Sequence, residues 1–217
     1  MADQPIRFYC DGQVHQIADL PITYTLLDWL RDVAHRTGSK EGCAEGDCGA
    51  CTVIVANLAE AGEVGGIRRG DLVLRPVNAC IRFLPTLHGK AVITIEDVRR
   101  LAGGALHPAQ QAMLDGHGSQ CGFCTPGFVM SLLALYLAHQ DDRAPPGRRA
   151  IADGLAGNLC RCTGYRPILD AGERMFTLPV VDFDTETIAA ALRGIARAVA
   201  LRGIARDDFT YAAPDPA

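Results

Sequence analysis

The sequence lacks several features that would place it in common classes of protein. It has no apolar run of the 18 or more residues that a membrane-spanning helix needs, and the longest candidate, Phe128–Ala138, is too short. It has no basic excess either, because 21 Lys and Arg stand against 25 Asp and Glu, for a formal net charge of −4. We therefore expect no membrane association and no nucleic-acid partner bound through a basic surface.

A secretion signal is also lacking. Met1–Pro5 is polar and has no apolar signal core, so we expect a cytoplasmic protein whose thiols stay reduced. Extensive disorder is unexpected, since 48% of the 217 residues are hydrophobic and 21% are charged. The length fits one large domain or two small ones. Nine cysteines in such a chain are not explained by a disulfide framework.

Eight of the nine cysteines fall into two sets of four. The first set has the pattern C-x4-C-x2-C with a distant fourth member, and consists of Cys43, Cys48, Cys51 and Cys80. The second set combines C-x2-C with C-x-C, and consists of Cys121, Cys124, Cys160 and Cys162. Two sets of four soft ligands predict two metal centres. Cys10 stands apart in a strand pattern, and we expect it to be a small buried hydrophobic residue.

The first set has the spacing of plant-type ferredoxins, in which such a loop and one distant cysteine hold a [2Fe–2S] cluster. Gly42, Gly46 and Gly49 suit a loop that must wrap closely around inorganic sulfide with its N–H groups directed inward. The alternative is structural zinc, but zinc ribbons favour paired C-x2-C units.

The second set leaves zinc and an iron–sulfur cluster both open. Thr125-Pro126 follows one cysteine pair, and Thr163 and Pro167 follow the other. Thr is a good N-cap and Pro a favoured first helical residue, so both pairs are predicted to lie just ahead of helix starts. The positive end of a helix suits an anionic cluster.

Hydrophobic patterns divide the chain into a strand-rich part and a helical part. Residues 5–17 predict a hairpin about Asp11-Gly12, and Thr25–Arg36 predicts an amphipathic helix with Trp29 beside its apolar face. Strands are expected at Thr52–Ala56, Leu72–Leu74 and Ala91–Ile95, with a surface excursion over 59–70. Helices are expected at Pro108–Asp115, Pro126–His139, Arg148–Ala156 and Pro167–Phe176.

These elements predict an α+β chain. Its N-terminal domain (1–95) is a β-grasp plant-type [2Fe–2S] ferredoxin, and residues 96–176 form an all-α four-helix bundle that binds the second [2Fe–2S] cluster. Residues 177–217 are expected to form a helical or extended linker toward a flavin domain or partner chain.

Three cysteine-bearing stretches, 40–53, 118–127 and 157–169, resemble the iron–sulfur portion of the molybdenum hydroxylase (xanthine oxidase) family. Glu45-Gly46-Asp47 and Gly157-Asn158-Leu159 are most similar to the bacterial xanthine dehydrogenase group. Relatives that act on aldehydes, N-heterocycles, carbon monoxide or aromatic thioesters are the alternatives within the family.

The resemblance implies an electron-transfer role in a multi-cofactor oxidoreductase. Substrate is hydroxylated at molybdopterin on a large partner chain, and electrons pass through two [2Fe–2S] clusters to FAD and then to NAD+. It assigns Cys121, Cys124, Cys160 and Cys162 to the molybdenum-proximal cluster, and Cys43, Cys48, Cys51 and Cys80 to the flavin-proximal one. Gln120 and Cys162 would contact the pterin. The resemblance also implies that the purines hypoxanthine and xanthine are oxidised to urate. It implies an assembly that is a dimer of heteromers.

No residues for the hydroxylation itself are expected on this chain. Its six histidines are scattered and are expected to be surface or packing residues: His15, His35, His88, His107, His117 and His139. Neither a G-x-G-x-x-G motif nor a phosphate-binding loop is evident, so flavin and NAD sites are expected elsewhere. Residues 212–217 resemble the approach to a flavin domain, which predicts that this is the N-terminal part of a longer chain.

Two readings from other functional classes stay open. An iron–sulfur redox sensor would need an output surface, for which a basic helix face is the weak candidate: Arg193, Arg197, Arg202 and Arg206. A zinc-stabilised scaffold would use the same cysteines as structural ligands.

Overall fold

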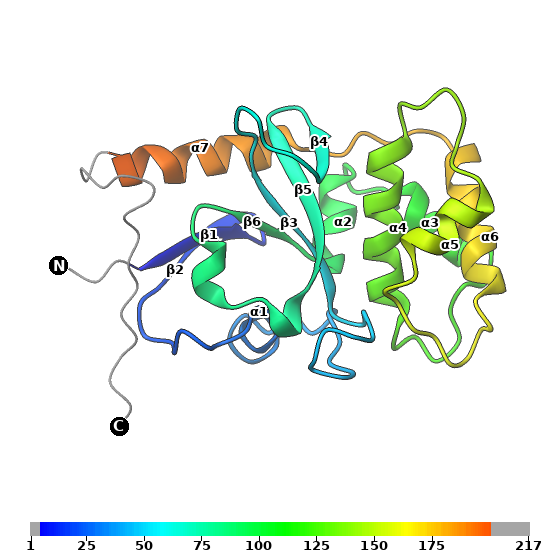
Figure 1. Ribbon diagram of the computed structural model, residues 1–217, viewed down its shortest axis with the longest axis horizontal. Coiled ribbons are helices and arrows are strands. Elements are labelled where there is room, and N and C mark those ends of the chain that lie inside the picture. The colour runs from blue at the N-terminus through cyan, green and yellow to red at the C-terminus, as the bar shows by residue number, and fades with distance from the viewer. Residues whose placement is uncertain (1–4, 201–217) are drawn as a thin grey trace.

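The computed structural model describes residues 5–200 and is built on a mixed sheet (Figure 1). The strand order is β2-β1-β6-β3-β5-β4, and neighbours are antiparallel except for the parallel pair β1 and β6. The strands are β1 (Ile6–Cys10), β2 (Gln13–Ile17), β3 (Thr52–Leu58), β4 (Ile67–Arg69), β5 (Leu72–Asn78) and β6 (Ala91–Ile93). The expected hairpin and three later strands are confirmed, and the α+β fold with a β-grasp first part is established.

Both faces of the sheet are buried. In β3, Val53 and Val55 face one hydrophobic cluster, whereas Ile54 and Ala56 face a second. The first cluster includes residues of α1 (Leu26–Asp28), of a π-helix (Trp29–Val33) and of two 3-10 turns (Ala79–Ile81 and Leu84–Leu87). The second is shared with α4 (Thr125–His139) and α7 (Glu186–Ala200). The two halves of the chain therefore share a core.

The helix expected over Thr25–Arg36 is shorter and less regular. It begins as predicted at Thr25, whose hydroxyl caps the Asp28 N–H at 3.1 Å, but it widens into a π-helix after Asp28. The extra residue in that turn rotates the rest of the helix, so that Val33 is 49% exposed and Trp29 is buried. Trp29 packs edge-on against Phe8, and its expected place beside the apolar face is wrong.

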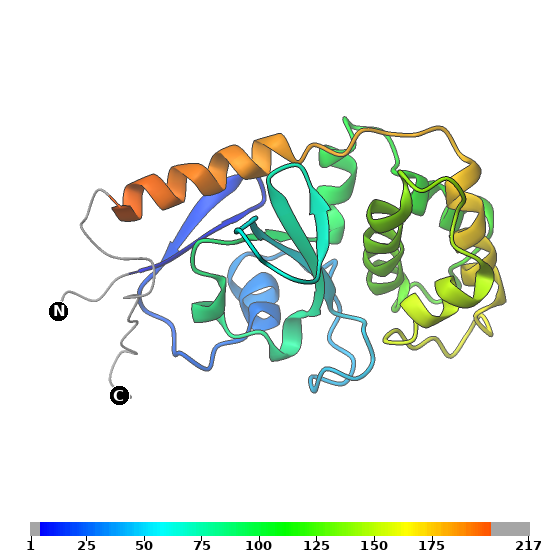
Figure 2. The same cartoon turned by 45° about the horizontal axis from the view of Figure 1, so that its top comes forward.

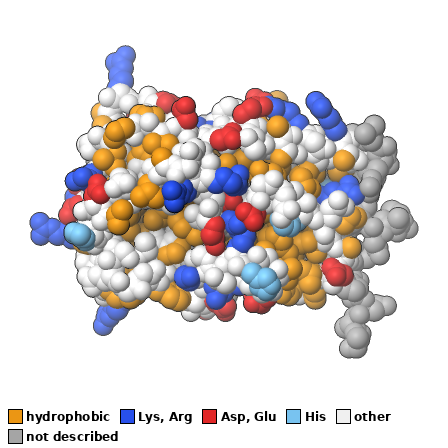
Figure 3. Space-filling view, turned by 180° about the vertical axis from the view of Figure 1, so that it is seen from behind, with side chains coloured by type: hydrophobic (Ala, Val, Ile, Leu, Met, Phe, Trp, Pro, Cys, Tyr) orange, Lys and Arg blue, Asp and Glu red, His pale blue; other side chains and the backbone are white. Residues whose placement is uncertain are grey.

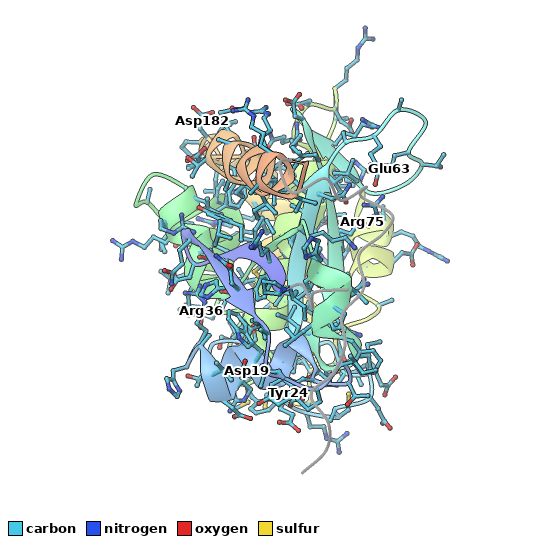
Figure 4. The ribbon with its side chains drawn as sticks, turned by 90° about the vertical axis from the view of Figure 1, so that its left-hand side faces the viewer. Asp19, Tyr24, Arg36, Glu63, Arg75 and Asp182 are labelled. Atoms are coloured by element: carbon cyan, nitrogen blue, oxygen red, sulfur yellow. The ribbon has the colours of Figure 1, made fainter. Side chains whose placement is uncertain are left out.

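The surface excursion over 59–70 carries the short strand β4 and is tied to the sheet by an ion pair. Arg75 on β5 lies 2.7 Å from a carboxylate oxygen of Glu63, and Figure 4 shows both at the same edge. Hydrogen bonds from Arg75 and Asn57 lower the pKa of Glu63 to about 2. The excursion is therefore an ordered part of the sheet edge.

The helical part follows the sheet. It consists of α2 (Ile95–Leu101), α3 (Pro108–Asp115), α4, α5 (Arg148–Gly154), α6 (Arg166–Arg174) and a 3-10 turn (Met175–Thr177). The four expected helices correspond to α3, α4, α5 and α6, with ends shifted by up to two residues. Helix α4 is apolar around its whole circumference because it packs between the sheet and the other helices (Figure 2).

After the bundle the chain returns to the sheet. Helix α7 lies across the strands and buries Ile188, Leu192 and Ile195 against them (Figure 1). The Asp184 N–H donates to the carbonyl of Leu101 at 2.8 Å just before this helix. The first part of the segment expected to be a linker is thus a packed strap. Residues 201–217, which include Arg202, Arg206 and the Pro/Ala-rich stretch, lie outside the described part.

The surface seen from behind mixes acidic, basic and hydrophobic side chains (Figure 3). None of the helices within residues 5–200 combines the length and apolar character needed to cross a membrane.

Candidate metal centres

The first four cysteines meet at one end of the β3–β5 ladder. Cys51 immediately precedes β3, and Cys80 follows β5, whose Asn78 pairs with Thr52. This register brings the two sulfurs to 3.4 Å, and both residues are buried. Cys43 and Cys48 lie on the preceding loop and are half-buried. We call this set the ferredoxin site.

Backbone N–H groups point at sulfur in the ferredoxin site. The amides of Asp47 and Cys48 each donate to Cys43 Sγ at 3.3 Å. Hydrogen bonds from the amides of Glu45 and Cys48 lower the pKa of Cys43 to about 7. Burial, with the neighbouring Cys51, instead raises the pKa of Cys80 to about 12. The loop thus favours a thiolate at Cys43, as a metal ligand requires.

Two glycines of this loop leave room that a side chain would fill. A Cβ on Gly42 would lie 2.8 Å from Cys48 Sγ, and one on Gly46 would lie 2.7 Å from Ile81. Gly46 also has φ +84°, a conformation that glycine adopts freely. The expected close wrapping of the loop is present, and four thiols with inward N–H groups fit an iron–sulfur cluster.

The other four cysteines meet between two helix starts. The thiols of Cys124 and Cys160 lie close enough for Cys160 to raise the pKa of Cys124, and Cys121 likewise raises the pKa of Cys162. Burial raises the pKa of Cys124 to about 12. For Cys160, burial opposes ionisation, but hydrogen bonds from Thr163 and Cys162 together with Cys124 outweigh it and lower the pKa. We call this set the helical site.

The capping expected at the helical site is wrong in detail. Cys124 itself is the N-cap of α4, so Thr125 is already inside the helix and bonds Ser119 through its hydroxyl at 2.7 Å. Helix α6 is preceded by Tyr165 in the left-handed conformation rather than by Thr163. The Thr163 hydroxyl accepts from the Tyr165 amide at 3.1 Å and lies 3.2 Å from Cys160 Sγ. Both threonine hydroxyls therefore form contacts within the cysteine loops instead of capping the helices.

One edge of the helical site faces outward. Gln120, Cys121 and Cys162 are all exposed, whereas Cys124 and Cys160 are half-buried. The residues expected to contact a pterin therefore lie together on the accessible side of the site.

Sequence reasoning missed two residues that support the cysteines. The Tyr165 hydroxyl accepts a hydrogen bond from the Cys160 N–H at 3.0 Å. The side-chain amide of Asn158 donates to the Gly49 carbonyl in the ferredoxin loop. Asn158 and its partner Gly49 are 109 residues apart, so no local pattern indicates the contact. Of the histidines, His107 is a buried packing residue that also caps α3 by accepting the Ala109 N–H.

Within residues 5–200, no three His, Cys, Asp or Glu side chains converge tightly enough to hold a single metal ion. Comparison with known families identifies the kind of cofactor that the two parts of the chain bind. Residues 8–81 match the model of a 2Fe-2S iron-sulfur cluster binding domain, and residues 94–173 match that of a second [2Fe-2S] binding domain. The chain is 44% identical over 178 residues to xanthine dehydrogenase of Emericella nidulans, covering 82% of this chain and 12% of that one. This chain belongs to the iron–sulfur portion of the molybdenum hydroxylase family.

Other relatives of this iron–sulfur portion carry different names. It is 43% identical over 173 residues to aldehyde oxidase 1 of Cavia porcellus, covering 80% of this chain and 12% of the relative. Among solved structures, quinoline 2-oxidoreductase from Pseudomonas putida 86 contains a chain with TM-score 0.62 and 28% identity, covering 89% of this chain and 99% of that one. Aldehyde oxidoreductase from Desulfovibrio desulfuricans has the same score and identity, with 98% and 19% covered.

The family assignment settles the choice of cofactor. Both matched domains bind [2Fe–2S] clusters, so the iron–sulfur portion has two cluster domains, and the zinc scaffold reading is wrong. The xanthine dehydrogenase and the aldehyde oxidase are far longer than this chain, which spans about 12% of each.

Proposed function

We propose that this chain relays electrons one at a time between a molybdopterin site and FAD in a molybdenum-containing hydroxylase, with NAD+ as the final acceptor. When bound, each [2Fe–2S] cluster accepts one electron and returns it. The observation that carries the proposal is the contact between the two sites: the Leu159 N–H, next to Cys160, donates to the Cys48 carbonyl at 3.0 Å.

The ligand assignment divides the work between two domains. Cys43, Cys48, Cys51 and Cys80, in residues 1–95, would hold the flavin-proximal cluster. Cys121, Cys124, Cys160 and Cys162, in residues 96–176, would hold the molybdenum-proximal one. The exposure of Gln120 and Cys162 supports their contact with a pterin on the partner region. Residues 177–217 would lead toward the flavin domain or partner chain after α7 has packed on the sheet.

The most similar relatives support xanthine dehydrogenase as the activity, with hypoxanthine and xanthine as substrates. Xanthine dehydrogenase 2 of Arabidopsis thaliana is 45% identical to this chain over 163 residues. The second candidate is aldehyde oxidation, favoured by the 43% identity to aldehyde oxidase 1. The partners would be a large molybdopterin subunit and an FAD region, in a dimer of heteromers.

Purification of the native assembly tests this proposal. We expect the chain to co-purify with molybdopterin and flavin, to give two rhombic [2Fe–2S] EPR signals on reduction, and to reduce NAD+ with xanthine. Reduction by an aldehyde but not by xanthine would support the second candidate. A preparation that lacks [2Fe–2S] signals in all states would contradict both.

A further inference from the structure

Asn158 lies between α5 and the first cysteine of the C-x-C pair, and its side chain is buried with every polar group bonded. Its Nδ2 donates to the Gly49 carbonyl at 3.0 Å and to Thr52 Oγ1 at 3.3 Å, and its Oδ1 accepts from Ser131 Oγ at 2.6 Å. One amide therefore joins the ferredoxin loop, the start of β3 and the middle of α4. We call this group of contacts the Asn158 joint.

The backbone groups around Asn158 are next in sequence to proposed cluster ligands of both sites. Gly49 lies between Cys48 and Cys51, and the Leu159 amide that bonds the Cys48 carbonyl directly precedes Cys160. The joint thus connects a ligand of the ferredoxin site to a ligand of the helical site through one hydrogen bond and a few covalent bonds.

At the joint the backbones of the two cysteine loops are packed too closely to admit a side chain. A Cβ on Gly49 would lie 2.3 Å from the Gly157 carbonyl oxygen, and a Cβ on Gly127 would lie 2.2 Å from the Gly49 carbonyl oxygen. Gly127 is in the first turn of α4, directly after the loop of Cys124. Since the contacting atoms are backbone on both sides, neither loop can shift toward the other.

A buried asparagine elsewhere in the core would merely satisfy its own hydrogen bonds. This one bonds the loop between two ligands of one site and stands two residues before a ligand of the other. We propose that Asn158 is a positioning residue that fixes the separation of the two cluster sites and the contact across which an electron passes between them. The proposal rests on the proposed function.

An electron that crosses this joint forms no bond and breaks none, because one site is oxidised and the other reduced by the same electron. Its rate therefore depends on separation and contact, which Asn158 controls. The substitution Asn158→Asp keeps the shape but replaces the donor with a carboxylate oxygen that faces the Gly49 carbonyl. Repulsion between these oxygens should open the joint.

EPR of the fully reduced holoenzyme provides the test, because two nearby unpaired spins split each other's signals. In the unaltered protein we expect two [2Fe–2S] signals with magnetic splitting at low temperature. Asn158→Asp should narrow that splitting and slow electron equilibration between the clusters in rapid-freeze experiments, with both signals kept. Should that variant fail to fold, Ser131→Ala removes only the bond that orients the amide, and a smaller narrowing is expected.

The control is Ile6→Val, a buried methyl deletion on β1 away from the joint. It should lower stability and leave the splitting unchanged. Two signals without any splitting in the unaltered protein, or splitting unchanged in Asn158→Asp and Ser131→Ala, would overturn the positioning role and leave the electron-transfer function intact. If the unaltered protein gave neither [2Fe–2S] signal, the proposed function itself would be refuted.

Discussion

The ferredoxin site and the helical site each contain four thiols, but the surroundings of the two sets differ. At the ferredoxin site, Cys51 and Cys80 are 2% and 7% exposed beneath the end of a sheet, and glycines are packed against sulfur and side chains. At the helical site, Cys121 and Cys162 are exposed, and Gly122 and Gly164 have open space beside them. One site is built into the core, whereas the other is presented at the surface, where a partner region can reach it.

Removal of one ligand from each site gives the largest expected effect. Cys43→Ser should abolish one of the two rhombic EPR signals and spare the other, and Cys121→Ser should do the reverse, because in our proposal each set of four thiols holds its own cluster. EPR of each reduced variant makes the check. Loss of both signals from one substitution would contradict the division into two independent sites.

A pair of glycine substitutions tests the difference in packing. Gly49→Ala should cost about 1–3 kcal/mol for overpacking and roughly 1 kcal/mol more for its positive φ. Gly122→Ala shares the positive φ but has open space, so only the roughly 1 kcal/mol of backbone strain is expected. Denaturant unfolding of both variants measures the costs. Equal costs would mean that the ferredoxin loop is not held as tightly as its contacts indicate.

Lowering the pH should destabilise the helical part of the chain more than the sheet, because His107 is buried in the helical part. Burial lowers its pKa from 6.5 to about 4 in the folded protein, so between these values the unfolded chain binds a proton that the folded chain does not. The free energy of unfolding is therefore highest above pH 6.5. It falls by up to roughly 3 kcal/mol as the pH falls from 6.5 toward 4.

Hydrogen exchange, corrected for intrinsic rates, should show α3 amides losing protection between pH 7 and pH 5 relative to β3 amides. His107→Asn keeps an acceptor for the Ala109 N–H without a group that titrates in this range. It should flatten this pH dependence. A variant with the same dependence as the unaltered protein would assign the effect to other groups.

The smallest effect is expected at the hydroxyl of Tyr165. Tyr165→Phe leaves the Cys160 N–H without its acceptor and should cost about 0.5–1.5 kcal/mol. The EPR signal of the helical site should shift, while that of the ferredoxin site stays in place. A shift of both signals would indicate that the sites are coupled more broadly than this one contact allows.

The cysteine spacing and the hydrophobic periodicity predicted most of what is local in this molecule. The hairpin about Asp11-Gly12 and the four bundle helices arise from patterns within a dozen residues. The π-helix after Asp28 could not be predicted, because it accompanies a contact of Trp29 with Phe8, which lies on a distant strand. The contacts of Asn158 and the return of α7 to the sheet join distant segments, and neither carries a signal in its own neighbourhood.

The path of the chain sets an order for its synthesis. All six strands described here are synthesised by residue 93, yet α4 and α7, which cover their second face, end at residues 139 and 200. Until then Ile54, Leu72 and Leu74 present an apolar surface to the cell. The ferredoxin loop is already synthesised in this interval, whereas its close contacts need Gly127 and Gly157, which come later in the chain. The first loop therefore lacks these contacts until residue 157 has been synthesised.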